Sequence, residues 1–285
     1  MHTHHSAHGH PGHERASDAD LAMARLLELD AEVLEPFLTQ LTGSLAALAD
    51  PAPIRILDLG SGPGTGTFAL ARRFTSAAIT AVDISPQMLH RLNKQAAALG
   101  LAERITTREA NLDEPWNDLG EDGPYDLIWA AAFLHHVADP GHALAQAFAH
   151  LRPGGLLAVT EMDFFPRFLP EDTGIGRPGL EARLHAATNT RPPHAWTGRL
   201  QDAGFAVEEP RPVEIRLDHA EAGPALNTYA QICLAKLRSH VTDVLDTEDL
   251  AAWDSLLDHT QPLSIAHRDD VSVRTTRTTW IARRP

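Results

Sequence analysis

The stretch "ILDLGSGPGTGTFALA", residues 56–71, decides the fold class of this chain. It places four glycines at alternate positions, Gly60, Gly62, Gly64 and Gly66, between an apolar run and a helical pattern. Because glycine has no Cβ, a loop rich in it lets the backbone approach another group closely. Such a loop directly after a strand predicts a nucleotide-cofactor site at the end of that strand.

Two common nucleotide motifs do not fit this loop. A dinucleotide fingerprint needs G-x-G-x-x-G, and its third glycine falls on Thr65 if the motif starts at Gly60, or on Thr67 if it starts at Gly62. A phosphate-binding P-loop needs Gly-Lys-Ser/Thr, which the stretch lacks. Hydride transfer and phosphate binding of these two kinds are therefore disfavoured.

Strands and helices alternate on both sides of the loop. Short apolar runs predict strands over 54–60, 78–84, 104–112, 125–132 and 156–163. Helical patterns fill 66–74 and 85–100, and a helix followed by a Gly-Gly turn fills 139–155. Strands that alternate with helices predict an α/β protein with a doubly wound parallel sheet.

In such a sheet a ligand lies at the carboxyl ends of the strands. The residues that follow the second and third strands are Asp83, then Asn111 and Leu112. The fourth strand is followed by residues 130–136, and the fifth ends in Glu161 and Asp163. The sequence therefore predicts that these groups meet at one edge.

The segment "ILDLGSGPG" resembles motif I, hhDhGxGxG, of the class I S-adenosylmethionine-dependent methyltransferases. The resemblance covers about residues 50–163, because the segments after the later strands follow the family order. It implies that Asp58 orients the loop or approaches the amino end of the methionine moiety. It also implies that Asp83 accepts the ribose hydroxyls and that Asn111, where many relatives have Asp, accepts from the adenine amine. The implied cofactor residues are Asp58, Gly60, Ser61, Gly62, Gly64, Asp83, Ile84, Met88, Asn111, Leu112 and Ala130.

The resemblance implies a seven-stranded, mostly parallel sheet of the class I methyltransferase fold, with two final strands within 200–217 and 271–284. A His-rich flexible tail is expected over 1–16, and two helices, near 18–29 and 31–48, belong to the N-terminal segment 17–50. The expected cofactor-binding core is 51–217. Residues 218–270 are expected to form a helical cap insertion, and 271–285 the final core strand.

The implied activity is transfer of a methyl group from S-adenosylmethionine to an O, N or C atom of a small molecule, leaving S-adenosylhomocysteine. The helical insertions resemble those of bacterial tailoring methyltransferases of secondary metabolism. His135 is the expected general base, since imidazole ordinarily titrates near pH ~6.5, and Glu161 is the competing one. No metal is expected in the reaction. The expected substrate contacts are Phe133, His136, Asp163, Arg167 and Tyr229.

Composition bounds the partners. The formal net charge is −14 and no long Lys/Arg run occurs, so a nucleic-acid partner is not expected. The single cysteine, Cys233, excludes an intrachain disulfide. No apolar stretch reaches the roughly 18 residues of a membrane span, and the N-terminus lacks a signal-peptide core, so a cytoplasmic monomer or homodimer is expected.

Three alternatives remain open at this point. The chain could methylate a peptide or protein, or it could be a fold relative that binds S-adenosylmethionine without transferring its methyl group. The first thirteen residues hold six of the seventeen histidines, so a metal-handling role of the tail is the third alternative. Several residues also have structural readings: Asp83 could cap the following helix, and Asn111 could be a turn residue.

Overall fold

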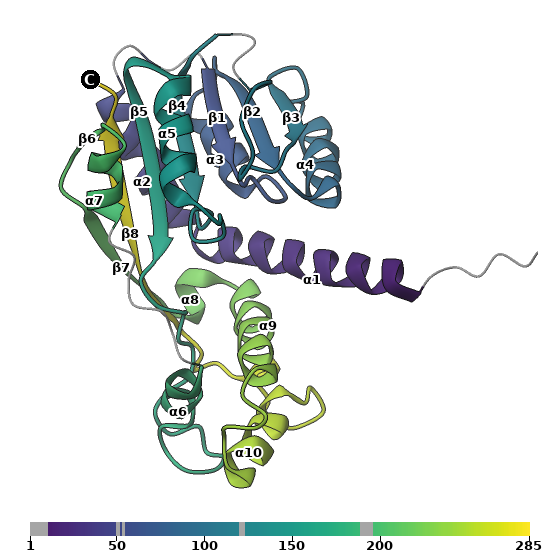
Figure 1. Ribbon diagram of the computed structural model, residues 1–285. Coiled ribbons are helices and arrows are strands. Elements are labelled where there is room, and N and C mark those ends of the chain that lie inside the picture. The colour runs from purple at the N-terminus through teal and green to yellow at the C-terminus, as the bar shows by residue number, and fades with distance from the viewer. Residues whose placement is uncertain (1–10, 50–51, 53–54, 120–122, 189–195) are drawn as a thin grey trace, which may run out of the picture.

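The structure is a computed structural model that describes residues 11–49, 52, 55–119, 123–188 and 196–285, with the side chains of 11–20 left out (Figure 1). Five parallel strands form the first part of its sheet, in the spatial order β3-β2-β1-β4-β5. The order reverses between β1 and β4, which is where an open α/β sheet holds its ligand. The strands are β1 (Arg55–Leu59), β2 (Ala78–Asp83), β3 (Ile105–Glu109), β4 (Tyr125–Ala131) and β5 (Leu151–Met162).

The far side of the sheet is antiparallel and contains one strand more than predicted. Strand β8 (Val273–Arg283) pairs with β5, and both β6 (Ala206–Val207) and β7 (Arg211–Leu217) pair with β8. Val207 lies opposite Ala282 and Arg211 opposite Thr279, so one extra residue bulges between the two short strands. The predicted sixth strand is thus split in two, because the bulge and Pro210, which has no N–H, interrupt its ladder.

The predicted Gly-Gly turn before the fifth strand is wrong. Strand β5 already begins at Leu151 and runs through Gly154 and Gly155 with a register shift against β4. Gly154 has φ 77°, and its N–H donates to the carbonyl of Arg284. The two glycines therefore form an irregular part of the strand, held by the C-terminal segment.

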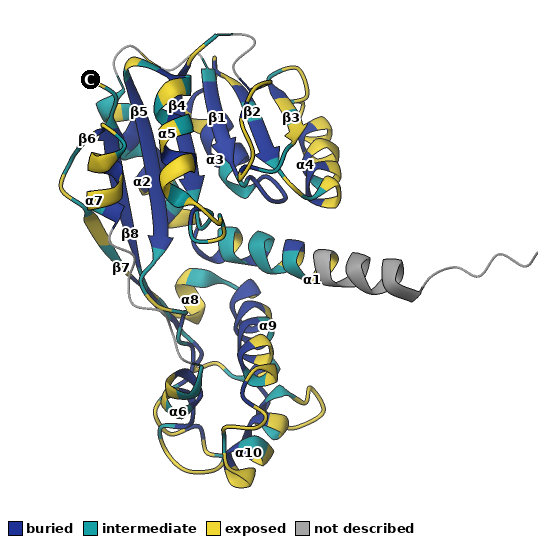
Figure 2. Ribbon diagram, in the orientation of Figure 1, coloured by how far each residue is buried: buried dark blue, intermediate teal, exposed yellow. Residues whose placement is uncertain are grey.

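Helices cover both faces of the sheet. Successive side chains along each strand point to opposite faces, so they belong in turn to two hydrophobic cores. One face packs under α2 (Glu35–Leu48), α3 (Thr65–Arg73) and α4 (Pro86–Ala98), with Ile56 and Trp129 among its buried residues. The other packs under α5 (Pro140–His150) and α7 (Trp196–Asp202), with Leu57 and Ile128. Figure 2 shows the resulting pattern: buried strands between helices that turn exposed faces outward.

A helical lobe hangs from the carboxyl end of β5 (Figure 1). It contains the segment after β5 and most of the predicted insertion 218–270. Its elements are α6 (Leu180–Ala187), α8 (His219–Ala222), α9 (Ala225–Ser239), α10 (Thr247–Leu257) and the 3-10 helix η1 (Ile265–His267). An ion-pair cluster ties the lobe together, since Arg183 binds the buried Asp249 with two hydrogen bonds of 2.6 and 2.8 Å.

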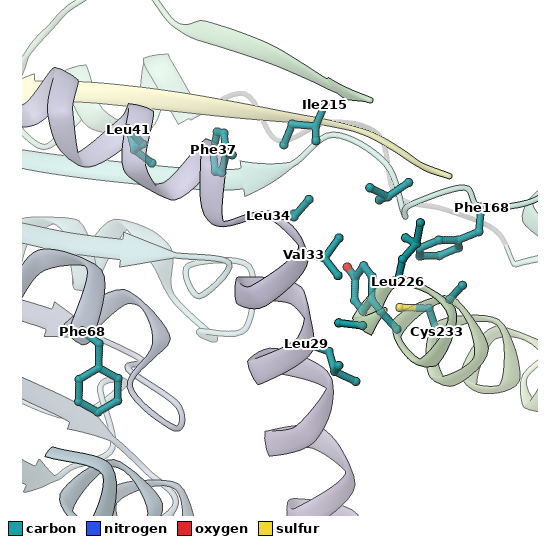
Figure 3. Packing of buried hydrophobic residues seen from close by; sticks show 14 of the residues in the cluster. Leu29, Val33, Leu34, Phe37, Leu41, Phe68, Phe168, Ile215, Leu226 and Cys233 are labelled. Atoms are coloured by element: carbon teal, nitrogen blue, oxygen red, sulfur yellow. The ribbon is translucent and has the colours of Figure 1, made fainter. Parts of the chain in front are cut away.

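Helix α1 (Pro11–Val33) runs along the carboxyl edge of the sheet, between the sheet and the lobe (Figure 1). It packs against α9, α4 and α3, and Figure 3 shows Leu29 and Val33 of α1 directed toward Leu226 and Cys233 of α9. The helix begins at Pro11, so residues 11–16 are helical rather than part of the predicted tail; residues 1–10 lie outside the described residues. Within the described residues, no helix has both the length and the apolar character needed to cross a membrane.

Candidate active site at the carboxyl edge of the sheet

The glycine loop joins the ends of β1 and β2. Gly60, Gly62 and Gly64 have φ values of 65°, 54° and 96°, a region that L-residues with side chains rarely adopt. The Ser61 N–H donates to the Val82 carbonyl at 2.9 Å, so the loop is attached to the neighbouring strand. The resulting turn is compact, and it leads directly into α3.

Protein side chains lie against the open sides of these glycines. A Cβ on Gly60 would lie 2.1 Å from Cδ2 of Phe133, and a Cβ on Gly62 would lie 3.2 Å from Cδ1 of Leu27 in α1. On Gly64 it would meet Leu92 at 2.7 Å. The glycines therefore also allow close packing of protein side chains, a role that their spacing in the sequence does not predict.

Asp83 ends β2 beside the loop. Its Oδ2 accepts from the Gly62 N–H at 2.8 Å and its Oδ1 accepts from the Ser85 N–H at 2.9 Å. Each carboxylate oxygen has a further lone pair for a ligand donor. The next residue, Ile84, is 65% exposed, which is unusual for a large apolar side chain beside a buried strand. Asp83 and Ile84 together present a charged acceptor and an apolar surface.

The remaining predicted cofactor residues surround the same edge. Leu112 and Ala130 are buried, and the Met88 N–H is capped by the Ser85 hydroxyl at 3.3 Å. Asn111 is half-buried, and its Oδ1 accepts from the Asp113 N–H at 3.2 Å. This hydrogen bond closes a turn, as expected if Asn111 is a turn residue. Both readings of Asn111 remain compatible with this geometry.

Asp58 lies behind the loop rather than at its surface. It is 2% exposed, and its Oδ2 accepts from the Thr67 hydroxyl of α3 at 2.6 Å. Burial raises the pKa of Asp58 to about 7; the hydrogen bond from Thr67 opposes the rise and the charge of Asp83 adds to it. Of the two roles predicted for Asp58, its position favours orienting the loop.

The buried carboxyl of Asp58 predicts a pH-dependent stability. A folded-state pKa of about 7, against 3.8 for an unperturbed carboxyl, means that the native state keeps a proton that the unfolded chain releases. The cost to folding is absent below pH ~4, grows as the pH rises to ~7, and stays near 4 kcal/mol above that. Asp58→Asn removes this titration, so its melting temperature relative to the wild type should be higher at pH 8 than at pH 5. An equal difference at both values would contradict the assignment.

His135 and Glu161 form a pair between the ends of β4 and β5. Nδ1 of His135 lies 2.7 Å from Oε2 of Glu161. Glu161 is 3% exposed, and its other oxygen is buried without a hydrogen-bond partner among the described residues. From the sequence alone the two residues are competing candidates for the base, whereas the geometry makes them one unit in which the carboxylate orients the imidazole.

The predicted substrate residues divide into two groups. Phe133 and His136 lie in the same loop as His135, and the two imidazole rings are in contact, with centroids 3.9 Å apart and planes tilted by 43°. Asp163 lies two residues after Glu161, and its carboxylate accepts from the Thr278 hydroxyl at 3.0 Å. Arg167 lies further away, where its backbone bridges to Arg274, and Tyr229 is 2% exposed with its hydroxyl bonded to Asp30. A direct substrate contact by Tyr229 does not fit this burial.

Three residues near the site escape sequence reasoning. Leu27 and Asp30 belong to α1, and Arg277 belongs to β8; none of them is part of a motif. The signal available in the sequence is weak: the stretch "LLELDAEVL" mixes apolar residues with three acidic ones, and the charge of any acidic residue that packing buries has to be matched.

The residues present fit a nucleoside cofactor with a polar, charged tail. The buried Ser61 hydroxyl has no hydrogen-bond partner among the described residues, and it lies in the glycine loop. The exposed Ile84 supplies an apolar surface and Asp83 a carboxylate, while no lysine occupies the loop to bind a phosphate. A cavity of about 1080 Å³ lies beside this site and is lined by residues of α1, α3 and α4.

Residues 56–155 match the family model described as a methyltransferase domain. Residues 56–155 form a methyltransferase domain. This match and the relatives described next support its assignment to the class I S-adenosylmethionine-dependent methyltransferases. The match covers β1 through the start of β5, which is the part that builds the glycine loop, Asp83 and the His135 loop.

Curated relatives match about half of this chain. A 27-O-demethylrifamycin SV methyltransferase of Amycolatopsis mediterranei is 32% identical over 139 residues, 48% of this chain and 49% of that protein. A trans-aconitate 2-methyltransferase of Pseudomonas aeruginosa is 34% identical over 145 residues, 47% of this chain and 49% of that protein. The chain therefore spans about half the length of these relatives.

Solved structures resemble this chain in fold over most of its length. A Bacillus halodurans protein described as a methyltransferase superposes with a TM-score of 0.52 at 15% identity, covering 86% of this chain and 98% of that one. A Galdieria sulphuraria protein described as a sarcosine dimethylglycine methyltransferase gives 0.51 at 17% identity, covering 86% and 84%. At this identity the likeness concerns the fold alone.

Proposed function

We propose that this protein transfers a methyl group from S-adenosylmethionine to an O, N or C atom of a small molecule, within bacterial secondary metabolism. One observation carries the proposal: the glycine loop bonded to Asp83, and the His135–Glu161 pair, lie at the same carboxyl edge of the sheet. The first can hold a cofactor and the second can remove a proton. The proposal includes action in the cytoplasm, as a monomer or homodimer.

The cofactor would lie against the glycine loop, with Asp83 accepting from its ribose and Ile84 against its base. When bound, S-adenosylmethionine supplies a methyl group that its sulfonium already activates. The protein therefore has to exclude water and align the acceptor atom, and proximity of this kind is worth several kcal/mol. Helix α1 contributes to that enclosure, because Leu27 covers the loop at Gly62.

His135 would take the proton of a hydroxyl or ammonium acceptor. The Glu161 carboxylate accepts from Nδ1–H, and this tautomer makes Nε2 the basic nitrogen. The same carboxylate stabilises the imidazolium after the proton has moved. Glu161 is itself held in place by the strand pairing of β5 with β8, so the pair is built on rigid elements.

The relatives support a small-molecule acceptor. Their names assign them rifamycin-type and trans-aconitate substrates, which are small molecules of different chemistry. A net charge of −14 also disfavours a polyanionic acceptor. The lobe formed by α6 and α8–α10 lies at the carboxyl end of β5, where it can enclose an acceptor of this size (Figure 1).

The test is turnover with methyl-labelled S-adenosylmethionine. The full chain is incubated with a panel of phenolic macrocycles, small polycarboxylates, amines and short peptides, and both S-adenosylhomocysteine and labelled product are measured. Label on a small molecule supports the proposal, whereas label only on peptides would show that the acceptor is a peptide or protein instead. Cofactor binding without turnover across the panel would favour the fold relative without transfer, and no binding would contradict the cofactor itself.

Asp83→Ala tests the cofactor assignment. Loss of the charged acceptor should weaken S-adenosylmethionine binding by about 1.5–3 kcal/mol, measured by calorimetric titration. Because Asp83 also holds Gly62 and Ser85, a modest loss of thermal stability is expected as well. The exposed Asp118→Ala is the matched control and should leave the affinity unchanged. Unchanged affinity in Asp83→Ala would mean that the ribose site lies elsewhere.

A further inference from the structure

Asp30 of helix α1 belongs to a buried polar cluster next to the candidate active site. Oδ1 of Asp30 accepts from Nη2 of Arg277 at 2.6 Å and from the hydroxyl of Tyr229 at 2.5 Å. The three residues come from α1, β8 and α9, so the cluster joins the N-terminal helix, the sheet and the lobe. Tyr229 and Arg277 are both buried, and Cys233 of α9 also interacts with the phenol.

Arg277 carries a full positive charge in this cluster. Burial opposes the charged form, but Asp30, Tyr229 and Glu161 together hold the pKa of Arg277 above its ordinary value. Its side chain also lies over the ring of Phe37, 5.8 Å from the centroid. A buried guanidinium that is not neutralised costs several kcal/mol, so the counter-charges around Arg277 decide its effect on its neighbours.

Two carboxylates lie near this guanidinium. Asp30 of α1 accepts a hydrogen bond from it. Glu161 is its neighbour in the pairing of β5 with β8, where Glu161 lies opposite Thr278 and Met162 lies opposite Arg277, and its charge favours the charged form of Arg277. Glu161 in turn holds Nδ1 of His135 at 2.7 Å. The charged and titratable groups linked in this way are His136, His135, Glu161, Arg277, Asp30, Tyr229 and Cys233.

The same turn of α1 touches the glycine loop. Leu27 precedes Asp30 by three residues, and its Cδ1 lies 3.2 Å from the position of a Cβ on Gly62. Residues three apart on a helix share one face. Seating α1 on the core therefore places Leu27 on the loop and Asp30 on Arg277 together.

We propose that Asp30 and Arg277 are positioning residues for the His135–Glu161 pair, so that seating of α1 over the glycine loop sets the charge that His135 experiences. With α1 packed on the core, Asp30 neutralises the charge of Arg277, and the Glu161 carboxylate accepts from the His135 imidazole. Without Asp30, the uncompensated positive charge of Arg277 acts on the His135–Glu161 pair and disfavours the protonated, positively charged imidazole. The inference rests on the proposed function only in naming the reaction that the pair serves.

The experiment is an NMR titration of the His135 imidazole in the full, unliganded protein, assigned by comparison with His135→Gln. Asp30→Asn should move the titration midpoint to lower pH by about 0.5–1 unit, and Arg277→Met should move it to higher pH by a similar amount. The double variant Asp30→Asn/Arg277→Met should return close to the wild type. A merely structural role would not produce opposite shifts that cancel.

Glu28→Gln is the matched control on the same helix. Glu28 pairs with Arg91 at 2.7 Å on the side of α1 toward α4, away from the cluster, and its loss should leave the titration unchanged. If Asp30→Asn does not fold, the comparison of Arg277→Met with the double variant still measures the contribution of Asp30, because both lack the buried cation. Shifts of the same sign in the two single variants, or no shift in either, would overturn the proposal.

Turnover separates this inference from the proposed function. If the wild type transfers methyl groups, the midpoint of its kcat–pH profile should move in the same direction as the imidazole titration in each variant. If the opposite NMR shifts are found but no acceptor is methylated, the charge coupling stands and the proposed function fails. If turnover is found without the opposite shifts, the proposed function stands and the charge coupling fails.

Discussion

His135→Ala is expected to lower kcat for a hydroxyl or ammonium acceptor by a factor of about 10²–10⁴, the usual contribution of a general base. The affinity for S-adenosylmethionine, measured by calorimetric titration, should change little, because His135 faces Glu161 and His136 rather than the glycine loop. Loss of cofactor affinity in the same proportion would instead make His135 a binding residue.

Glu161→Gln separates the two members of the pair. If Glu161 orients His135, the amide should cost less turnover than loss of the imidazole, because it can still accept from Nδ1–H but no longer stabilises the imidazolium. His142→Ala is the control, since it removes an exposed imidazole of α5. If His135→Ala keeps near-full turnover while Glu161→Gln loses most of it, the base is Glu161. If neither matters, proximity alone carries the reaction, as a nucleophilic acceptor permits.

Gly60→Ala is expected to destabilise the protein by about 2–4 kcal/mol, the sum of a strained backbone and a steric overlap in a packed site. At φ 65° the new Cβ would lie 2.1 Å from Cδ2 and 3.0 Å from Cβ of Phe133, so rotating the ring does not remove the overlap. Thermal unfolding should show a fall of about 5–15 °C. S-adenosylmethionine binding should weaken as the loop shifts.

Gly100→Ala separates the two causes. Gly100 has φ 69°, but nothing lies within 4 Å of the added Cβ, so only the backbone strain remains. Its melting temperature should fall by clearly less than that of Gly60→Ala. Adding Phe133→Ala to Gly60→Ala should recover part of the loss relative to Phe133→Ala alone. Equal effects of the two glycine variants would mean that Phe133 moves aside without cost.

The alternation of strands and helices, the glycine loop and the acidic residue after β2 could all be predicted because their signals are local. Apolar runs and caps act over a few residues: Ser85 and Pro86 begin α4 where their sequence places them, and the Ser85 hydroxyl accepts from Met88. Parallel strands then bring their carboxyl ends to one edge by geometry alone. The position of Asp83 beside Gly62 follows from these two facts.

The split of the sixth strand and the extent of α1 were not predictable in the same way. The bulge between Val207 and Arg211 depends on which residues of β8 lie opposite, and no local pattern states that register. Helix α1 continues to Val33, past the predicted end near residue 29, because packing of its second half on α9 and the core supports these residues (Figure 3). Both are tertiary effects on weak local preferences.

By itself, the sequence determined the α/β class, the order of the core elements and the residues at the strand ends, since these depend on short-range periodicity and on motif spacing. Only the tertiary structure decided that Glu161 and His135 form a pair rather than alternatives, that Phe133 lies against Gly60, and that Asp30 meets Arg277. Asp30 and Arg277 are separated by 247 positions in the chain. Contacts of that range arise when packing buries two charges together, because an isolated buried charge would be too costly to keep.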